Sequence, residues 1–530
     1  MLFHGKNRGS IPRRGNITMF ASSFLFYFQF HLVELFFTLF TLTFFTVGTI
    51  YSTINAYKAV NFWIVWIRLF RNLAFFLLFF YFVFFGCYFS FVSGYGLGFA
   101  SSFIFEIEWF ILGLLVVLLY WLEFYGIMEK SYQFELVVIL AVGVLGLFVM
   151  LFASNFLTFF IGVEMQNLMM YILLASRFKD LSLSLEAALK YFILAALASL
   201  LLLFGIARIY LVCGTLDFSV LSLLFPLLLS TSGVTVLLGG LACVLVMFLF
   251  KFTLVPFHSW ALDVYEGGPL YTMYFFVLLS KAAYLATFII LFTQVFRGSL
   301  VFFRPIIFWS SFFSIALGVA SGLTQVKIKR LLAYSSVVHM GLMFLVFVQW
   351  YHLHTMFVLF FYFFMYSLMN IAMFHVLFMW KFGFSRSFEY ISDFLGLRER
   401  SILLASGLAC IFFSFVGLPP FVGFWAKATL LSYYVAKELW AIVFLIILGS
   451  MISAYYYLGV VRVMWFESGK KIAFYTNYSP VSIFVFIALV LTLFGVGLDL
   501  WQDILEELVV SMLWLSAYGP VSNVWTVWWF

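Results

Sequence analysis

Fourteen apolar stretches, each long enough to cross a lipid bilayer, constrain this chain more than any other feature of its sequence. A transmembrane helix needs about 20 apolar residues, and a lipid-exposed segment must satisfy its backbone hydrogen bonds internally. Each stretch is therefore expected to be a helix. The stretches fall at 20–48, 73–93, 109–126, 134–153, 156–176, 187–210, 232–255, 269–296, 305–325, 330–349, 355–380, 402–430, 438–462 and 480–498. The sequence predicts an all-α polytopic membrane protein with about 14 transmembrane helices.

The composition excludes several soluble classes of protein. Of the 530 residues, 66% are hydrophobic and only 9% are charged, whereas about a quarter of the residues in a soluble domain are charged. Too few polar residues remain to cover a globular surface, which excludes a soluble enzyme, a nucleic-acid-binding protein and a disordered scaffold. The four cysteines are scattered and form no C-x-x-C pair, which argues against structural zinc, iron–sulfur ligation and a disulfide framework.

The charge pattern indicates how the chain is organised. Residues 1–19 form a basic tail without an acidic residue, which leads directly into an apolar stretch. We interpret it as a soluble tail before the first span, with a cleaved targeting segment as the alternative.

In a membrane protein, a positive net charge such as the +7 of this chain indicates which loops lie on the positively charged side of the membrane. Basic loops between spans one and two, nine and ten, eleven and twelve, and thirteen and fourteen predict one common side, the matrix or cytoplasm. The basic tail falls on the opposite side and departs from that rule.

Phenylalanine is unusually abundant, with 77 residues. Leucine would serve equally well against lipid, so this bias suggests a T-rich coding genome, as in many organelles. It is an inference about coding rather than about physics, and it favours a mitochondrial origin over a bacterial one.

Ionisable residues inside apolar stretches need a reason, because one at the bilayer centre costs about 2.5–3.5 kcal/mol on insertion scales. Glu164 lies in the fifth span, where the alternative role is a helix cap or an interhelical hydrogen bond. Lys190 lies near the start of the sixth span, four residues after Glu186, so a simple i,i+4 ion pair is its alternative role. Lys281 lies near the middle of the eighth span, where its side chain reaches water poorly.

Two further lysines accompany proline breaks. Pro256 follows Lys251 by five residues, and Pro419 and Pro420 precede Lys427 in the twelfth span. Proline lacks the backbone donor and clashes with the preceding turn, so the helix is predicted to break at each site. Broken helices are how membrane transporters build ion sites. A lysine whose ammonium reaches the membrane surface is the alternative for Lys251.

The positions of these charges suggest a repeat. Spans four to eight (134–296) and nine to thirteen (305–462) form two five-helix units, after N-terminal helices at 20–126 and before a C-terminal helix and tail at 463–530. Lys251 and Lys427 each lie on the proline-broken fourth helix of their unit, while Glu164 and His339 each lie on the second. An odd number of spans per unit gives the two units opposite orientation, which predicts two inverted repeats.

A row of buried acid, lysine and histidine residues can pass protons. Burial disfavours the charged form of each of these groups, so each can change its protonation when a neighbouring charge moves. The histidines argue against haem ligation, because His339 and His352 have no matching pair on a second helix. The polar segment with His258, Asp263 and Glu266 is expected to be a loop that closes a pathway mouth or caps helices. No glycine-rich phosphate loop supports ATP-driven transport.

The stretch KFTLVPFHSWALDVYEGGP, followed by LLSKAAYLATF, resembles chain 2 of NADH–ubiquinone oxidoreductase, one of three antiporter-like membrane subunits of respiratory complex I. Supporting stretches are IGVEMQNLMMYILLA, SLEAALKYFILAALASLLLLFGIARIY, TQVKIKRLLAYSSVVHMGLM and GLPPFVGFWAKATLL. Together they cover about residues 150–430. Leu262 and the pair Leu270–Tyr271 depart from the usual pattern, and spans one to three match weakly.

The resemblance implies a role for each charged residue. Glu164 matches a glutamate paired with a lysine on span six or seven, Lys190 and Lys251 match a first half-channel, and Lys281 matches the link between halves. Lys427 matches the exit half-channel, and His339 stands where a connecting histidine often occurs.

The resemblance also implies a setting for the chain. It implies no redox cofactor here, with FMN, iron–sulfur clusters and quinone in other subunits. The expected partners are other membrane-arm subunits, including sister chains, and lipids, but no nucleic acid. The expected location is the mitochondrial inner membrane, with a bacterial inner membrane as the alternative. A stand-alone cation/proton antiporter and a structural membrane scaffold are the rival functions.

Overall fold

The computed structural model describes residues 71–72, 101–129, 134–176, 181–228, 233–349, 353–383, 389–400 and 402–468. Within these ranges the regular structure is helical, apart from two isolated backbone bridges, Asn155–Asp217 and Lys327–Tyr390. Eight helices there are long and apolar enough to cross a membrane. The prediction of an all-helical polytopic membrane protein is confirmed at this level. The predicted spans 20–48, 73–93 and 480–498, the tail 1–19 and His352 lie outside the described residues.

The first five-helix unit of the sequence analysis corresponds to ten helical elements, of which the last four form one continuous segment, Leu270–Val295. The elements are α4 (Phe134–Leu151), α5 (Phe156–Ala175), α6 (Leu181–Cys213), α7 (Phe218–Leu228), α8 (Val234–Lys251), α9 (Ser259–Gly267), α10 (Leu270–Tyr274), η1 (Phe275–Ser280), α11 (Lys281–Ile289) and η2 (Ile290–Val295). α3 (Ser101–Glu129) precedes them.

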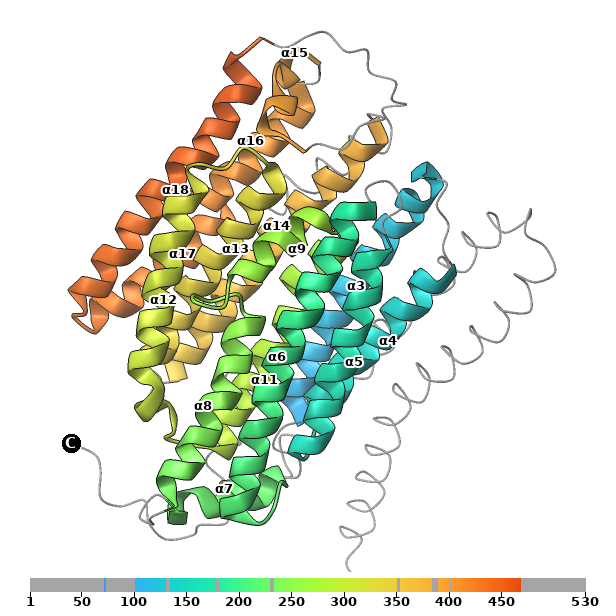
Figure 1. Ribbon diagram of the computed structural model, residues 1–530. Coiled ribbons are helices and arrows are strands. Elements are labelled where there is room, and N and C mark those ends of the chain that lie inside the picture. Colours follow the sequence, from blue (N-terminus) through green and yellow to red (C-terminus); the bar gives the residue numbers. More distant parts are fainter. Residues whose placement is uncertain are drawn as a thin grey trace, which may run out of the picture.

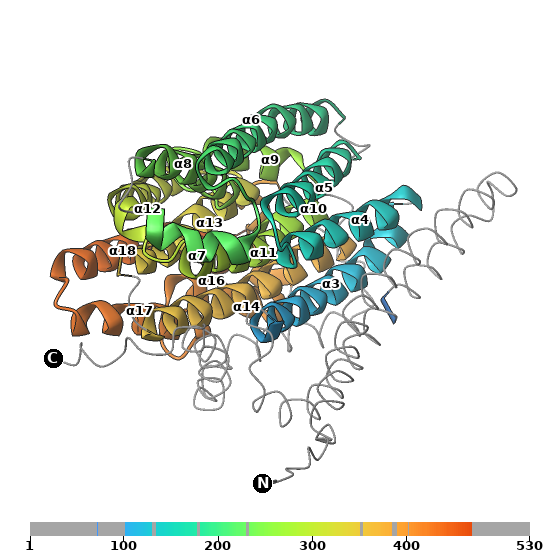
Figure 2. The same cartoon turned by 90° about the horizontal axis from the view of Figure 1, so that it is seen from below.

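The second unit contains the remaining described helices. They are α12 (Leu300–Gly322), α13 (Ile328–Leu345), η3 (Val346–Gln349), α14 (Leu353–Gly383), η4 (Ile391–Phe394), α15 (Leu397–Arg400), α16 (Ile402–Val416), α17 (Val422–Ala436) and α18 (Trp440–Phe466). Figures 1 and 2 show the long helices side by side in one bundle.

Burial separates the inner helices from the outer ones. The most apolar window of the segment Leu270–Val295 is completely buried, and that of Ile328–Gln349 is 89% buried. The corresponding windows on α6, α12 and α18 are only 39% buried. Figure 2 shows α11 and α13 enclosed by other helices. Large apolar side chains on the outer face of α6, such as Leu189 and Phe204, are exposed, as expected for a lipid-facing helix.

A close crossing of α6 and α8 depends on two glycines. A Cβ on Gly205 would lie 2.7 Å from the carbonyl oxygen of Gly240, and a Cβ on Gly240 would lie 2.9 Å from that of Gly205. Small residues at a membrane helix crossing let the two backbones approach closely. This crossing fixes α8, and with it Lys251, against α6.

Two parts of the first unit differ from the sequence prediction. The segment with Asp263 and Glu266 was expected to be a loop, but it is the helix α9. Its apolar residues Trp260, Ala261, Val264 and Tyr265 are buried, and their spacing places them on one helical face. The polar residues and glycines of the segment hid that periodicity.

The helix α7 was not among the predicted spans. It is 11 residues long, which corresponds to about 17 Å and is shorter than a hydrocarbon core of about 30 Å. It is therefore too short to cross the bilayer.

Candidate functional site

Lys251 ends α8 and is held by three neutral acceptors. Its side chain is buried, and its Nζ donates to Oε1 of Gln166 at 3.3 Å, to Oη of Tyr191 at 3.1 Å and to Oδ1 of Asn167. A lysine ammonium has three donors, so each donor has a partner. The ammonium also lies 5.1 Å from the centre of the Tyr284 ring. The protein thus accommodates this cation with amide, phenol and aromatic groups.

Glu164 reaches Lys251 through Asn167. The Nδ2 of Asn167 donates to Oε1 of Glu164 at 3.4 Å, while its Oδ1 accepts from Lys251. Among the described residues, Glu164 forms no direct ion pair with a lysine. The amide therefore bridges the acid and the lysine, with its NH2 group on one and its oxygen on the other.

A tyrosine connects this cluster to the fully buried span. Tyr284 Oη donates to Oε1 of Gln166 at 2.6 Å, the same oxygen that accepts from Lys251. Tyr284 stands three residues after Lys281 on α11, so the two side chains lie on the same helix face. Lys281 is completely buried, and its Nζ has no hydrogen-bond partner among the described residues. Such a cation is costly to keep in the membrane without a function.

Lys190 lies in a different setting from Lys251. Its Nζ is 2.7 Å from Oε1 of Glu186 and 2.7 Å from Oδ2 of Asp263, and its side chain is 43% exposed. The i,i+4 pair with Glu186, given above as the alternative role, is therefore present. The structure places Lys190 in a partly exposed ion-pair network rather than among the buried acceptors of Lys251.

Asp263 is the centre of that network. Burial by itself raises its pKa, but hydrogen bonds and charge from Lys190 and Arg330 outweigh that effect and hold the pKa of this carboxyl below its usual value. Lys327 donates to Glu266, and this hydrogen bond raises the pKa of Lys327 although burial lowers it.

His258, the third polar residue expected in this segment, directly precedes α9. Burial of its imidazole lowers its pKa.

Lys427 takes two carbonyl oxygens that the proline break leaves free. In a continuous helix the carbonyls of Phe415 and Val416 would accept from residues 419 and 420, and both of these are prolines without an N–H. Lys427 Nζ donates to these two carbonyls at 3.1 and 2.7 Å. The break between α16 and α17 thus supplies the ligands of the lysine that follows it.

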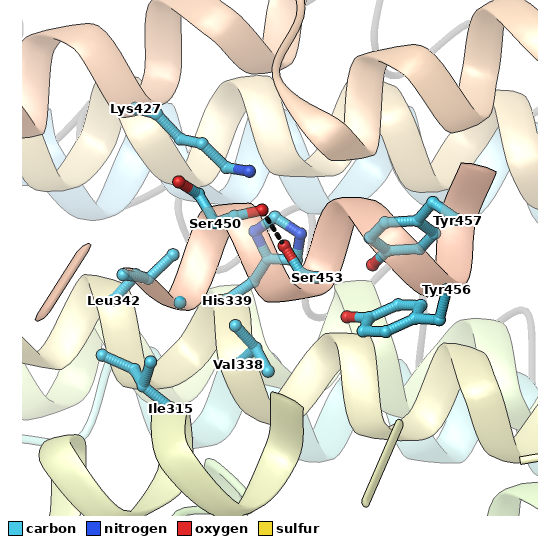
Figure 3. A pocket seen from close by; sticks show the side chains of 10 residues that line it. Ile315, Val338, His339, Leu342, Lys427, Ser450, Ser453, Tyr456 and Tyr457 are labelled. Carbon is cyan, nitrogen blue, oxygen red and sulfur yellow. Dashed lines mark hydrogen bonds between the residues drawn. The ribbon is translucent and has the colours of Figure 1, made fainter. Parts of the chain in front are cut away.

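His339 lies beside Lys427 across a small cavity. The imidazole is buried on α13, with its Nδ1 2.9 Å from Oη of Tyr362. The cavity volume is about 10 Å³, close to the smallest space that holds one water molecule. Figure 3 shows the Lys427 ammonium pointing towards His339 and Ser453, with the Tyr456 and Tyr457 hydroxyls facing them. Polar groups of α13, α17 and α18 therefore face a space at the lower limit of what one water needs, and Ile315, Val338 and Leu342 form the apolar part of its wall.

The structure brings the candidates together as two buried clusters and one partly exposed network. The first cluster contains the buried Lys251 and the partly buried Glu164, the second contains His339 and Lys427, and Lys281 is buried on the central span. Lys190 belongs to the network. Sequence reasoning missed Gln166, Asn167, Tyr191, Tyr284 and Arg330. The signal for two of them was present, because Gln166 and Asn167 interrupt an apolar span just after Glu164.

Comparison with known proteins identifies the relatives of this arrangement. Residues 153–453, more than half of the chain, match the family described as NADH:quinone oxidoreductase/Mrp antiporter, transmembrane. The chain belongs to this family. The matched range contains every charged candidate named above, and the resemblance inferred from the motifs is confirmed.

Individual relatives agree with the family match. The chain is 34% identical over 348 residues to NADH-quinone oxidoreductase subunit N of Paramagnetospirillum magneticum, covering 64% of this chain and 69% of that protein. It is 32% identical over 350 residues to NADH-ubiquinone oxidoreductase chain 2 of Marchantia polymorpha, covering 66% and 70%.

Solved structures show the same fold. A chain of respiratory complex I from Thermus thermophilus aligns with a TM-score of 0.64 at 24% identity, covering 87% of this chain and 98% of that one. A chain of the Mrp complex from Dietzia aligns with a TM-score of 0.71 at 17% identity, covering 92% and 99%.

Proposed function

We propose that this chain is a proton-translocating membrane subunit of respiratory complex I. Electron transfer from NADH to quinone elsewhere in the complex would drive charge rearrangements along its buried groups. The family to which the chain belongs includes complex I subunits. Within that family, the burial of four ionisable side chains is the observation that carries the proposal. Lys251, Lys281, His339 and Lys427 are each no more than 8% exposed, and they lie on four different helices.

We further propose that the chain forms about 14 transmembrane helices with two inverted five-helix repeats. The fourth helix of each unit supports this arrangement, because both are interrupted beside a buried lysine. The interruption between α8 and α9 follows Lys251, and the one between α16 and α17 precedes Lys427. The basic loops then face the matrix or cytoplasm.

Each candidate receives a role in this proposal. Glu164 and Lys251 form the coupled pair of the first half-channel through Asn167, with Lys190 at the partly exposed entrance. Lys281 links the halves, and His339 passes the proton to Lys427 across the small cavity that both residues line at the exit half-channel.

The remaining assignments concern the setting of the chain. We assign no redox cofactor to it and place FMN, iron–sulfur clusters and quinone in other subunits. Its partners are other membrane-arm subunits, including sister chains, and membrane lipids. The phenylalanine-rich sequence and the relative from Marchantia favour the mitochondrial inner membrane, and the bacterial relatives make a bacterial inner membrane the alternative.

The first test is a native gel of mildly solubilised membranes, probed for this chain and stained for NADH oxidation. Co-migration with a very large NADH-oxidising band supports the proposal. The variants Lys251→Ala and Glu164→Ala should then lower proton pumping and coupled oxidoreductase activity while the complex still assembles. Full pumping by both variants would overturn the assigned roles.

A stand-alone cation/proton antiporter is the second candidate, because the family and the Mrp structure include antiporter proteins. It predicts that the chain migrates away from NADH oxidation and exchanges sodium or potassium for protons in vesicles containing this chain alone. A structural scaffold predicts a third result, in which the charge-removing variants fail to assemble rather than fail to pump.

A further inference from the structure

The carboxylate of Asp263 joins the two helical units of the chain. Its Oδ2 lies 2.7 Å from Nζ of Lys190 on α6, and its Oδ1 lies 3.0 Å from Nη2 of Arg330 on α13. Lys190 and Arg330 are 140 positions apart in the sequence. Asp263 itself lies on α9, the short helix that resumes after the break beside Lys251. One side chain therefore contacts both units at once, with a separate oxygen for each.

The rest of α9 is held to the start of α13. Glu266 pairs with both Lys327 and Arg330, which stand at the first turn of that helix. Lys329 Nζ donates to the carbonyl oxygen of Gly268 at 2.7 Å and to that of Glu266 at 3.3 Å. The position of α9 and the position of the α13 N-terminus are therefore linked by side-chain and backbone contacts.

The network holds three acids and three ion-paired cations. The acids are Glu186, Asp263 and Glu266, the cations are Lys190, Lys327 and Arg330, and the Lys329 ammonium lies beside them on backbone carbonyls. Asp263 shares its charge between a cation on each unit. If Lys190 loses its proton or moves away, Asp263 keeps Arg330 as its ion-pair partner. The repulsion between Lys190 and Arg330 is then gone, so the net attraction that holds Arg330 at Asp263 increases.

Stability alone gives a poor account of these contacts. The side chains of Lys190, Asp263 and Arg330 are 43%, 36% and 40% exposed. Ion pairs that water reaches to this extent contribute little to folding. A charge-sensing role fits their position better, because α13 carries Arg330 in its first turn and His339 about two and a half turns later.

We propose that Asp263 is a positioning residue. Through its contact with Arg330, it couples the charge of Lys190 to the position of the N-terminal end of α13. A change at the entrance of the first unit thereby reaches the helix that carries His339 in the second. The inference rests on the proposed function, since it gives that function a route between the two units besides the buried lysines.

The test uses the assembled complex with two matched variants. Asp263→Asn and Glu186→Gln each remove one acid from Lys190, but only the first also removes a carboxylate from Arg330, which keeps its second partner, Glu266. We measure protons pumped per NADH oxidised, the pH profile of pumping, and the amount of assembled complex. Asp263→Asn should lower protons pumped per NADH about two- to thirtyfold, the fold-change that corresponds to the effect of one residue on an energetic coupling. Glu186→Gln should cause less than half of that loss.

Two further variants separate coupling from structure. Asp263→Glu keeps the carboxylate and should restore most of the pumping and its pH profile. In a Lys190→Gln background, Asp263→Asn should add little, because residues that act through one another are not additive. Equal losses in Asp263→Asn and Glu186→Gln, or full additivity with Lys190→Gln, would overturn the inference.

Assembly provides the remaining control. If Asp263→Asn does not assemble, Arg330→Gln replaces it, with the same loss of pumping expected and the same non-additivity with Lys190→Gln. Failure of both variants to assemble assigns the network a structural role and overturns the inference. The outcome of Lys251→Ala keeps the two proposals distinct. Loss of pumping there, with no difference between Asp263→Asn and Glu186→Gln, leaves the proposed function intact and removes only the coupling role.

Discussion

Lys427 Nζ lies 2.7 Å from the carbonyl oxygen of Val416, on the other side of the proline break. Val416 would accept from residue 420 in a continuous helix, and that residue is a proline. The lysine therefore replaces a backbone donor that the sequence removed. The helix break and the buried lysine therefore depend on each other, because the break supplies the two carbonyl acceptors that the ammonium needs.

Restoring the backbone donor at position 420 should weaken the hydrogen bond between Lys427 and the Val416 carbonyl. In Pro420→Ala the new N–H competes with Lys427 for the Val416 carbonyl. A hydrogen bond to a charged group contributes about 1.5–3 kcal/mol, so the positioned ammonium loses up to that much. We expect a severalfold loss of proton pumping in the assembled complex. Pro305→Ala, at the exposed start of α12, is the control. Equal pumping by Pro420→Ala and the unmodified protein would contradict this account.

Asn167 provides a second test, because it joins Glu164 to Lys251. Asn167→Leu keeps a similar size but leaves the buried ammonium short of one acceptor, at a cost of about 1–3 kcal/mol. Proton pumping should fall nearly as far as in Lys251→Ala, measured as acidification per NADH oxidised. Asn167→Asp retains an acceptor and should preserve more activity. The link through Asn167 is wrong if the leucine variant pumps normally.

Gly423 should be intolerant of any side chain. A Cβ there would lie 1.8 Å from the carbonyl oxygen of Ser414, because α16 and α17 approach closely at the break. Overpacking of this kind costs about 1–3 kcal/mol, so Gly423→Ala should lower the amount and thermal stability of the assembled complex. Gly459→Ala on α18 is the matched control, since its Cβ would meet nothing within 4 Å. Similar melting temperatures for both variants would count against the close approach.

The Asp263 network should respond to acid in one direction. Its carboxyl pKa is held below the usual value, so the stabilisation it provides is fully present above the unfolded value of about 3.9. It is lost as pH falls through the lower folded pKa. Hydrogen-exchange protection of α9 should therefore stay constant from neutral pH down to about pH 4 and decrease only below it.

Asp263→Asn is the control for this acid response. It removes the ionisable group, so the acid-dependent decrease in α9 protection should become smaller. A decrease that already begins near neutral pH in the unmodified protein would show that another group controls α9.

Regular structure was largely predictable, with informative exceptions. Apolar stretches of the right length predicted the long helices, because a membrane admits little else. α9 was missed because Asp263, Glu266 and two glycines resemble a loop, although its buried residues have helical spacing. α7 was missed because 11 residues are too few for a span.

The candidate charges were predictable one by one, since each is out of place in an apolar stretch. Their surroundings were not, because partners come from distant parts of the chain. Lys251 depends on Gln166, 85 positions away, and Lys190 on Asp263, 73 positions away. No local pattern indicates that Lys251 receives neutral acceptors while Lys190 receives two acids.

The sequence by itself therefore determined the membrane, the helices, the breaks and the identity of the buried cations, since apolar length, proline chemistry and the cost of charge in lipid act locally. Only the tertiary structure decided which groups meet. It placed Asn167 between Glu164 and Lys251, gave the free carbonyls of α16 to Lys427, and placed Asp263 between α6 and α13. Such contacts depend on how helices cross, and a side chain of a few ångströms reaches only the partners that the crossing brings to it.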